Sequence, residues 1–201
     1  MKQTFLFFDT ETSGFPKKLS HNDPNQSWCC QIGAISTSYE GEVLAELDVL
    51  IKANGRDIPP FIQQLTGITP EMTMEKGVEE LEAIEQFVNL MSGVSKYVCH
   101  NYDFDSQFIN HLFLRNMDDL SDLARYKYFI PLPYFCTMKD RDIVKYVGLK
   151  NKIGKPKWPK LEELYFHLFE KNFDNAHNAM ADVRATKDCF FELIKREVIK
   201  L

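Results

Sequence analysis

The chain opens with a short apolar run, after which the pattern of hydrophobic and polar positions changes between strand and helix periods. Phe5-Leu6-Phe7-Phe8 is apolar at every position, which is typical of a strand buried on both faces. Residues 28–38 and 43–52 have the length and composition of two more strands, and the short link 39–42 suits a hairpin. The pattern predicts three neighbouring strands with the first in the centre.

Most of the remaining chain shows helical spacing. Pro59-Pro60 begins a short helix that ends before Gly67, Thr69-Pro70 starts the next turn, and apolar residues continue at helical spacing over 74–91. A strand is expected at 96–100 and an extended segment at 130–137, with helices over 104–116, 118–128, 138–147, 160–169 and 178–199. The order predicts an α/β fold, a central mixed sheet covered by helices, in one domain over 1–201.

Composition narrows the class of protein. The 201 residues are 44% hydrophobic and 26% charged, as is ordinary for a soluble globular protein, and no apolar run is long enough for a membrane span. The N-terminus leads straight into a strand without a signal peptide. Five cysteines lack CxxC spacing, which favours free thiols over disulfides or a zinc site. We expect a cytoplasmic protein with no membrane contact.

Charge is unevenly distributed along the chain. The net charge of −5 does not suggest a polycation, but residues 143–161 contain six lysines and no acid. Trp158 adds a flat apolar face to this window. The composition predicts a loop that follows a phosphate backbone, with Lys155 and Lys157 as contacts. A solvated lysine loop is the alternative.

Two carboxylates follow the first strand. Asp9 and Glu11 are separated by one residue, so on a strand both leave the same face. Like charges beside a buried strand repel each other and resist desolvation. A divalent cation such as Mg²⁺ or Mn²⁺ would offset that repulsion, since both prefer oxygen ligands. A strand that ends in a solvated acidic turn is the alternative.

Two later segments carry further carboxylates. Asp105 is expected in the first turn of the helix that follows the strand ending at His100, with Asp103 as the N-cap. Residues 174–182, D-N-A-H-N-A-M-A-D, place His177 at a helix start and Asp182 five residues later. The alanines would let this helix approach the sheet closely. His177 could be a cap, or an imidazole suited to proton transfer.

The four carboxylates come from three separated segments, each at an element end that should reach the edge of the sheet. Asp9, Glu11, Asp105 and Asp182 would repel strongly on convergence unless they held two divalent cations. Two such ions would support phosphodiester hydrolysis by a two-metal-ion mechanism, in which His177 would deprotonate the attacking water.

These motifs resemble those of the DnaQ-like 3′–5′ exonucleases of the DEDDh type. The matching pieces are F-D-T-E-T-S-G, H-N-Y-D-F-D and A-H-N-A-M-A-D, together with the turn L-T-G-I-T at 65–69. The exonuclease (epsilon) subunit of bacterial DNA polymerase III is a similar member. The resemblance implies an RNase H-like fold and two metal ions on Asp9, Glu11, Asp105 and Asp182, with His177 as general base.

The resemblance also implies residues that border the 3′-terminal nucleotide through backbone amides and an apolar wedge: Thr10, Thr12, Ser13, Gly14 and Phe15. Asn101 is expected to help orient the site. Asp103 lies outside the family pattern and is left as a cap.

The expected activity is removal of nucleoside monophosphates from 3′ ends of single-stranded DNA. The chain stops soon after the third motif, without the tail that a polymerase-binding subunit carries, which favours a stand-alone enzyme. A polymerase partner in trans, in proofreading or repair, is a second possibility, and an exoribonuclease that trims short RNA or tRNA ends is a third. A catalytically idle nucleic-acid-binding protein and a phosphatase or nucleotidase for small substrates are the alternatives from other classes.

Overall fold

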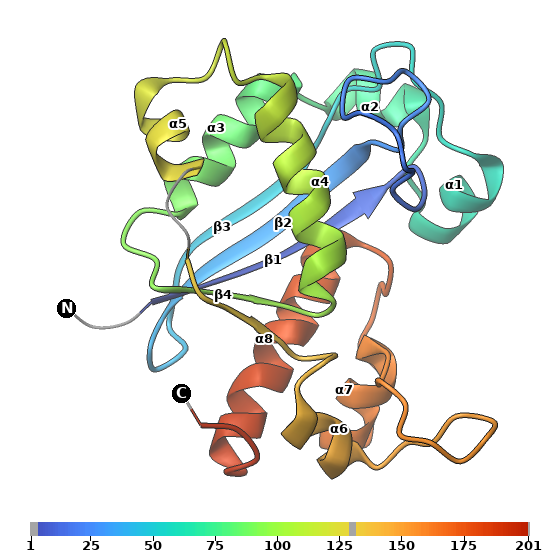
Figure 1. Cartoon of the computed structure of the whole chain (residues 1–201), viewed down its shortest axis with the longest axis vertical. Helices are drawn as coiled ribbons and strands as arrows, with labels where there is room; N and C mark the ends of the chain where they lie inside the picture. Colours follow the sequence, from blue (N-terminus) through green and yellow to red (C-terminus); the bar gives the residue numbers. More distant parts are fainter. Residues whose placement is uncertain (1–3, 129–131, 201) are drawn as a thin grey trace.

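A five-stranded mixed sheet forms the centre of the protein (Figure 1). The structure, a computed structural model, describes residues 4–128 and 132–200. The strands lie in the order β3-β2-β1-β4-β5 and comprise β1 Thr4–Thr12, β2 Cys29–Ser38, β3 Val43–Leu50, β4 Lys96–Cys99 and β5 Tyr134–Cys136. Strand β1 runs antiparallel to β2 and parallel to β4, which confirms the mixed sheet with the first strand inside it.

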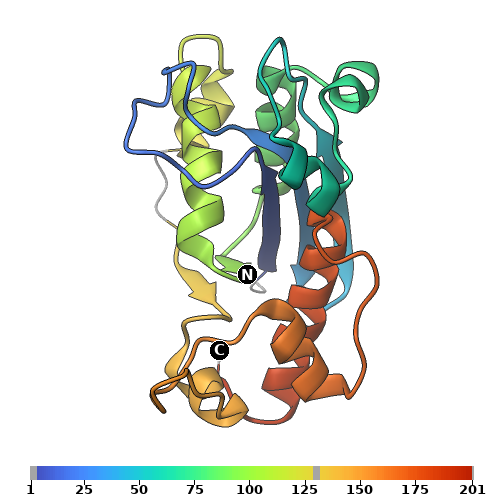
Figure 2. The same cartoon turned by 90° about the vertical axis from the view of Figure 1, so that its right-hand side faces the viewer.

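Helices cover both faces of the sheet. They are α1 Pro60–Thr66, α2 Pro70–Lys76, α3 Glu80–Leu90, α4 Tyr102–Arg115, α5 Asp122–Tyr128, α6 Arg141–Val147, α7 Leu161–Phe169 and α8 Ala179–Lys195. In Figure 1, α3, α4 and α5 lie in the upper half and α6, α7 and α8 in the lower half. The turned view shows α4 and α8 on opposite sides of β1 (Figure 2).

The alternation of side chains along β1 divides the core in two. Leu6 and Phe8 join the apolar cluster that includes residues of α3 and α4, whereas Phe5 and Phe7 join the cluster that includes residues of α7 and α8. Because strand side chains alternate between faces, an uninterrupted apolar run is what a strand covered on both faces requires. The apolar run therefore predicted the central strand correctly.

The helical pattern over 74–91 is interrupted, so the prediction of one helix there was wrong. Gly77 ends α2, Val78 pairs with Ile51 in an isolated bridge, and α3 begins only at Glu80. A β-carbon at Gly77 would lie 2.3 Å from the carbonyl oxygen of Thr73, which explains why the turn needs glycine. The last helix ends at Lys195 rather than at 199. Residues 130 and 131 of the predicted extended segment lie outside the described residues.

None of the helices within 4–128 and 132–200 has both the length and the apolar character needed to cross a membrane. The single domain expected over 1–201 stays a prediction.

Candidate active site

Three carboxylates meet at the end of β1. One carboxylate oxygen from each of Asp9, Glu11 and Asp182 lies within 4.8 Å of the other two. Asp9 and Glu11 leave the same face of β1, and Asp182 comes from the first turn of α8. The structure thus brings together two segments more than 170 residues apart in the chain, as the motif spacing predicted.

The close approach of α8 to the sheet depends on two residues of β2. Gly33, paired with Asp9, has no side chain, and a β-carbon there would lie 2.6 Å from the carbonyl carbon of Ala179. Gln31, paired with Glu11, is buried and accepts a 3.2 Å hydrogen bond from the amide of Ala179. These contacts fix the start of α8, and hence Asp182, against the strands that carry the other two carboxylates.

Asp105 approaches the sheet from α4 and is only 2% exposed. Its Oδ1 accepts hydrogen bonds from the amide of Thr10 at 3.0 Å and from the Thr10 hydroxyl at 2.8 Å. Thr10 therefore holds the Asp105 carboxylate beside Asp9 and Glu11, and its amide is not free for a substrate. Asp105 is close enough to both of those carboxylates to raise their pKa values.

Burial and mutual repulsion disfavour ionisation of the cluster. Burial, reinforced by Asp182 and Asp105, raises the pKa of Glu11 to about 8. Burial and the neighbouring carboxylates raise the pKa of Asp9 well above its ordinary value. Burial also raises the pKa of Asp105 and of Asp182 to about 7. A divalent cation is the counter-charge that would let all four ionise at neutral pH.

An unpaired oxygen gives a second sign of a cation site. Asp182 Oδ1 is buried and has no hydrogen-bond partner in the described structure. Buried carboxylate oxygens without partners are unfavourable, because they lose water without a replacement. Oxygen donors in this number and at this separation could hold a divalent metal ion.

His177 lies in the loop just before α8, as expected. Its backbone adopts the left-handed region at φ 67°, and its side chain is exposed. The N-cap of α8 is Asn178, whose side chain accepts a hydrogen bond from the amide of Ala181, so His177 is not the cap. Asp182 lies in the first turn of the helix rather than more than one turn inside it.

Residues shortly after Glu11 line a groove whose described lining includes none of the four carboxylates. Ser13, Gly14 and Phe15 contribute to a cavity of about 540 Å³, with Phe61 among its other lining residues. Phe15 is 83% exposed and meets the edge of Phe104 at 5.8 Å between ring centroids.

The polar groups of this loop are partly engaged already. The Ser13 amide donates to the Trp28 carbonyl, and the Thr12 hydroxyl donates to the Gly14 carbonyl. Gly14 and Phe15 are accordingly the better candidates of this segment for contacting a ligand.

Asn101 and Asp103 differ from one another in role. Asn101 is the N-cap of α4, in the left-handed region at φ 77°, and its side chain makes no capping hydrogen bond. The expectation that Asp103 caps the helix was wrong: it lies inside the first turn, is exposed, and pairs with Lys139. The helix begins at Tyr102, two residues earlier than a cap at Asp103 would allow.

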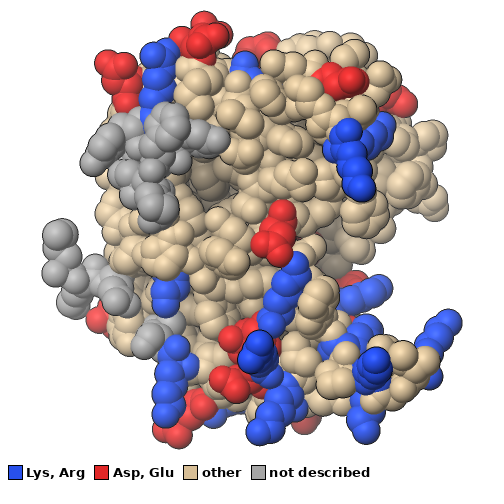
Figure 3. Space-filling model, in the orientation of Figure 1, with Lys and Arg blue, Asp and Glu red and all other residues tan. Residues whose placement is uncertain are grey.

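The lysine-rich segment forms a hairpin that projects from the body of the protein (Figure 1). Lys150 and Pro156 form its antiparallel bridge, and Lys155 is exposed near its end. Lys and Arg side chains gather over this lower part of the molecule (Figure 3). Lys157 instead lies 2.5 Å from Glu163 Oε1, so its ammonium is engaged within the chain.

Several residues around the cluster were not predicted from the sequence. Gln31 and Gly33 position α8, and Glu162 of α7 lies close enough to raise the pKa of Asp182. His100, directly after β4, is a half-buried anchor for the lysine-rich segment. The available signal was Gln31, a polar residue within the apolar first part, 29–35, of a predicted strand.

Comparison with known proteins places the chain in a family. The family model described as RNase_T: Exonuclease matches residues 6–190. The 3′-5′ exonuclease DinG of Bacillus subtilis (strain 168) is 28% identical over 97% of this chain and 18% of that protein. Exodeoxyribonuclease I of Escherichia coli (strain K12) is 29% identical over 92% of this chain and 38% of that protein. The chain thus spans less than half the length of these relatives.

A solved structure shows the same fold. The crystal structure of E. coli Exonuclease I in complex with a dA16 oligonucleotide superposes with a TM-score of 0.71 at 27% identity, over 97% of this chain and 41% of that chain. The particular likeness to the epsilon subunit stays a prediction. The chain belongs to the exonuclease family, of the DnaQ-like DEDDh type that its motifs predicted.

Proposed function

We propose that the chain is a 3′–5′ exonuclease that removes nucleoside monophosphates from single-stranded DNA. The observation that carries the proposal is the convergence of Asp9, Glu11 and Asp182 within 4.8 Å in a chain of the exonuclease family. DNA is favoured over RNA because similar proteins are named Exodeoxyribonuclease I and are crystallised with a DNA oligonucleotide. A cytoplasmic location and a polymerase partner in trans stay predictions.

Four carboxylates would hold two divalent ions, Mg²⁺ or Mn²⁺. Asp9, Glu11 and Asp182 supply oxygens near one another, and Asp105 adds a buried carboxylate that Thr10 orients. When bound, the ions would polarise the scissile phosphate and offset the charge that develops on it. The raised pKa values of the carboxyl groups and the unpaired Asp182 oxygen support this assignment.

His177 would act as the general base. Its imidazole takes a proton from water as the water oxygen bonds to phosphorus and the bond to the 3′ oxygen of the preceding nucleotide breaks. The leaving 3′ oxygen takes a proton from solvent, so the products are a nucleoside monophosphate and a strand one nucleotide shorter with a free 3′-hydroxyl. Because the side chain of His177 is exposed, it can return that proton to solvent between turnovers.

The groove lined by residues that follow Glu11 in the chain would receive the terminal nucleotide. Ser13, Gly14 and Phe15 line it, and the exposed ring of Phe15 supplies an apolar contact for a base. Thr10 and Thr12 support the site from within the fold, and Asn101 orients the start of α4. Lys155 would contact a phosphate further along the strand, whereas Lys157 stabilises the loop through Glu163.

The test uses the full chain and two oligonucleotides of matched sequence, one DNA and one RNA, each labelled at the 5′ end. We expect Mg²⁺ or Mn²⁺ to support stepwise shortening from the free 3′ end, and EDTA to abolish it. A blocked 3′ end should prevent it as well. Asp182→Ala should lose metal binding and activity together, whereas Asp188→Ala, on the same helix but exposed, should retain both.

Each result bears on a separate part of the proposal. Faster shortening of the RNA strand would replace DNA by RNA as the substrate. Metal binding without cleavage of either strand would contradict the exonuclease and favour the small-substrate or the idle-protein alternative. Cleavage that survives in Asp182→Ala would contradict the assigned site.

A further inference from the structure

Trp158 is a large aromatic side chain that stays 57% exposed although its loop is held on both sides. On one side the amide of Lys157 donates to the Leu149 carbonyl at 2.9 Å, and the Lys157 ammonium pairs with Glu163. On the other side the Pro159 carbonyl accepts a hydrogen bond from a half-buried histidine. The indole is therefore presented to solvent on a fixed backbone, which lowers the entropy lost when a ligand binds it.

That histidine is His100, which directly follows β4. Its Nε2 lies 3.1 Å from the Pro159 carbonyl oxygen, and its Nδ1 lies 2.9 Å from the Thr137 hydroxyl. A carbonyl oxygen only accepts, so Nε2 carries a hydrogen. In the neutral ring Nδ1 then accepts from the Thr137 hydroxyl, whose other acceptor within reach, the Cys99 carbonyl oxygen, is more distant at 3.3 Å. The histidine is neutral in this role, since burial lowers its pKa to about 4.

Strand register places this anchor beside the carboxylates. Strands β1 and β4 run parallel with Phe7 opposite Val98, so Asp9 and His100 lie two residues further along each strand. Glu162, four residues after Trp158, is near enough to Asp182 to raise its pKa. The segment that begins with Trp158 therefore ends, at Glu162, within electrostatic reach of Asp182.

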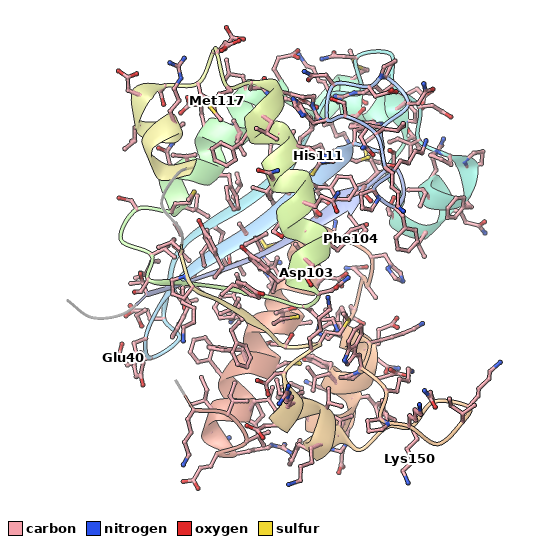
Figure 4. All side chains as sticks on the ribbon, in the orientation of Figure 1. Glu40, Asp103, Phe104, His111, Met117 and Lys150 are labelled. Carbon is pink, nitrogen blue, oxygen red and sulfur yellow. The ribbon has the colours of Figure 1, made fainter. Side chains whose placement is uncertain are left out.

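The first turn of α4 connects Trp158 to the other exposed ring at the site. Asp103 pairs with Lys139, whose ammonium lies 5.2 Å from the centroid of the Trp158 ring, and the next residue, Phe104, contacts Phe15. Asp103 and Phe104 lie together at the end of α4 that carries Asp105 (Figure 4). Phe15 and Trp158 thus lie near the same helix end as two separate exposed aromatic surfaces.

Beyond Trp158 the surface becomes basic. Lys150, Lys152 and Lys155 are exposed on the projecting hairpin, and Lys150 is labelled there in Figure 4. A ring on which a base can stack, followed by cations for the phosphates, is the arrangement by which proteins bind single strands without reading their sequence. A small phosphomonoester would reach neither feature.

We propose that Trp158 is a stacking platform for a base upstream of the 3′-terminal nucleotide in a single-stranded substrate. The inference rests on the proposed exonuclease function and adds a second aromatic subsite to it. With the platform, the enzyme binds several nucleotides of the strand. The terminal groove and the carboxylates are sufficient to bind and hydrolyse a single phosphodiester.

The test compares a substrate long enough to contact Trp158 with one that is too short to do so. One is octathymidylate, and the other is the p-nitrophenyl ester of thymidine 5′-monophosphate, which has a single base. Trp158→Ala should raise KM for octathymidylate on the order of 10-fold, as is usual when one stacked base loses its aromatic partner. It should leave hydrolysis of the nitrophenyl ester at the parent rate.

Two further variants control the experiment. Trp158→Phe keeps a ring and should retain most of the affinity for octathymidylate. Ile153→Ala truncates an apolar residue that is 75% exposed on the same hairpin, and it should leave both substrates unaffected. Octathymidylate should also quench tryptophan fluorescence of the metal-free parent but not of metal-free Trp158→Ala.

The failures are distinguishable. An unchanged KM for octathymidylate in Trp158→Ala would overturn the platform while leaving the exonuclease intact. Equal losses on both substrates would also overturn it, because they would indicate a structural role for the indole. A parent protein that hydrolyses neither compound would overturn the proposed function itself.

Discussion

At the scale of single residues, Gln31 connects two parts of the candidate site. Its Oε1 accepts the amide of Ala179 at 3.2 Å, and its Nε2 donates to Asp48 Oδ1 at 2.7 Å. Gln31→Met keeps the length of the side chain but leaves the buried amide without an acceptor. We expect a loss of about 1–3 kcal/mol in the free energy of unfolding. We also expect roughly 10–100-fold weaker Mn²⁺ binding, as for other residues that orient metal ligands.

Urea unfolding and a Mn²⁺ titration measure the two effects separately. Asp48→Asn retains an oxygen for the Gln31 amide and serves as the control, with ion binding close to the parent's. A variant Gln31→Met that is less stable yet binds Mn²⁺ as tightly as the parent would show that Gln31 only fills space.

His177 gives the second prediction at this scale. His177→Ala should retain the divalent ions, since no carboxylate is removed, but its turnover should fall by on the order of 10²–10⁴-fold for loss of a general base. Single-turnover cleavage of a 5′-labelled strand at saturating Mn²⁺ isolates that step. Turnover equal to the parent's would remove His177 from the mechanism.

Local sequence patterns could predict the role of a single residue only where its partner lies close to it in the sequence. The strand period places Asp9 and Glu11 on one face, so their pairing needs no tertiary information. Gln31 contacts a residue 148 positions away, which no local pattern indicates. Lys155 and Lys157 look equivalent in the sequence, and only the position of Glu163 at the start of α7 distinguishes them.

At the scale of elements, the approach of α8 to β2 is set by the absence of a side chain at Gly33. Its β-carbon would lie 2.6 Å from one backbone atom of Ala179 and 2.7 Å from another, distances that real contacts do not show. Gly33→Ala must therefore push α8 outward, at about 1–3 kcal/mol for overpacking. Because Asp182 moves with the helix, we expect activity to fall by on the order of 100-fold, as for a displacement of about 1 Å in an active site.

Ala34→Gly is the matched control, since Ala34 is the next residue of β2 and packs in the other apolar cluster. It should lose about 1 kcal/mol for a glycine within a strand while keeping its activity. Calorimetry and cleavage assays on both variants give the comparison. Full activity in Gly33→Ala would mean that the carboxylates tolerate a displaced helix.

Element boundaries were the least predictable part of the fold. Apolar spacing runs through 74–91 without a break, yet the chain leaves the helix at Gly77 so that Val78 can pair with Ile51. That pairing is a tertiary contact and outweighs local helical spacing. The early start of α4 has a local origin instead, because the left-handed backbone of Asn101 turns the chain into the helix without a side-chain cap.

At the scale of the whole molecule, the sheet could be predicted because its evidence is spread along the chain. One mixed sheet is favoured by three features of the sequence. They are the apolar side chains on both faces of β1, the hairpin of β2 and β3, and the later alternation of helix and strand. The position of the lysine-rich hairpin could not be predicted, because a contact that helps to hold it crosses the molecule. His100 at the sheet holds Pro159 at 3.1 Å, and the residues are 59 positions apart.

This contact makes a prediction about stability and pH. Burial lowers the pKa of His100 from 6.5 to about 4, so protonation favours the unfolded chain. The contribution of His100 is fully present above pH 6.5 and is lost as pH falls toward 4.

Between pH 7 and pH 5 the parent should lose about 2 kcal/mol of unfolding free energy more than His100→Gln, which keeps an amide donor but does not titrate. The carboxylate cluster titrates in both proteins, so its contribution cancels in the difference. Urea unfolding of both proteins at a series of pH values measures that difference. Parallel pH profiles would mean that His100 is protonated, or free of Pro159, in the folded protein, and the fixed presentation of the lysine-rich segment would then need another anchor.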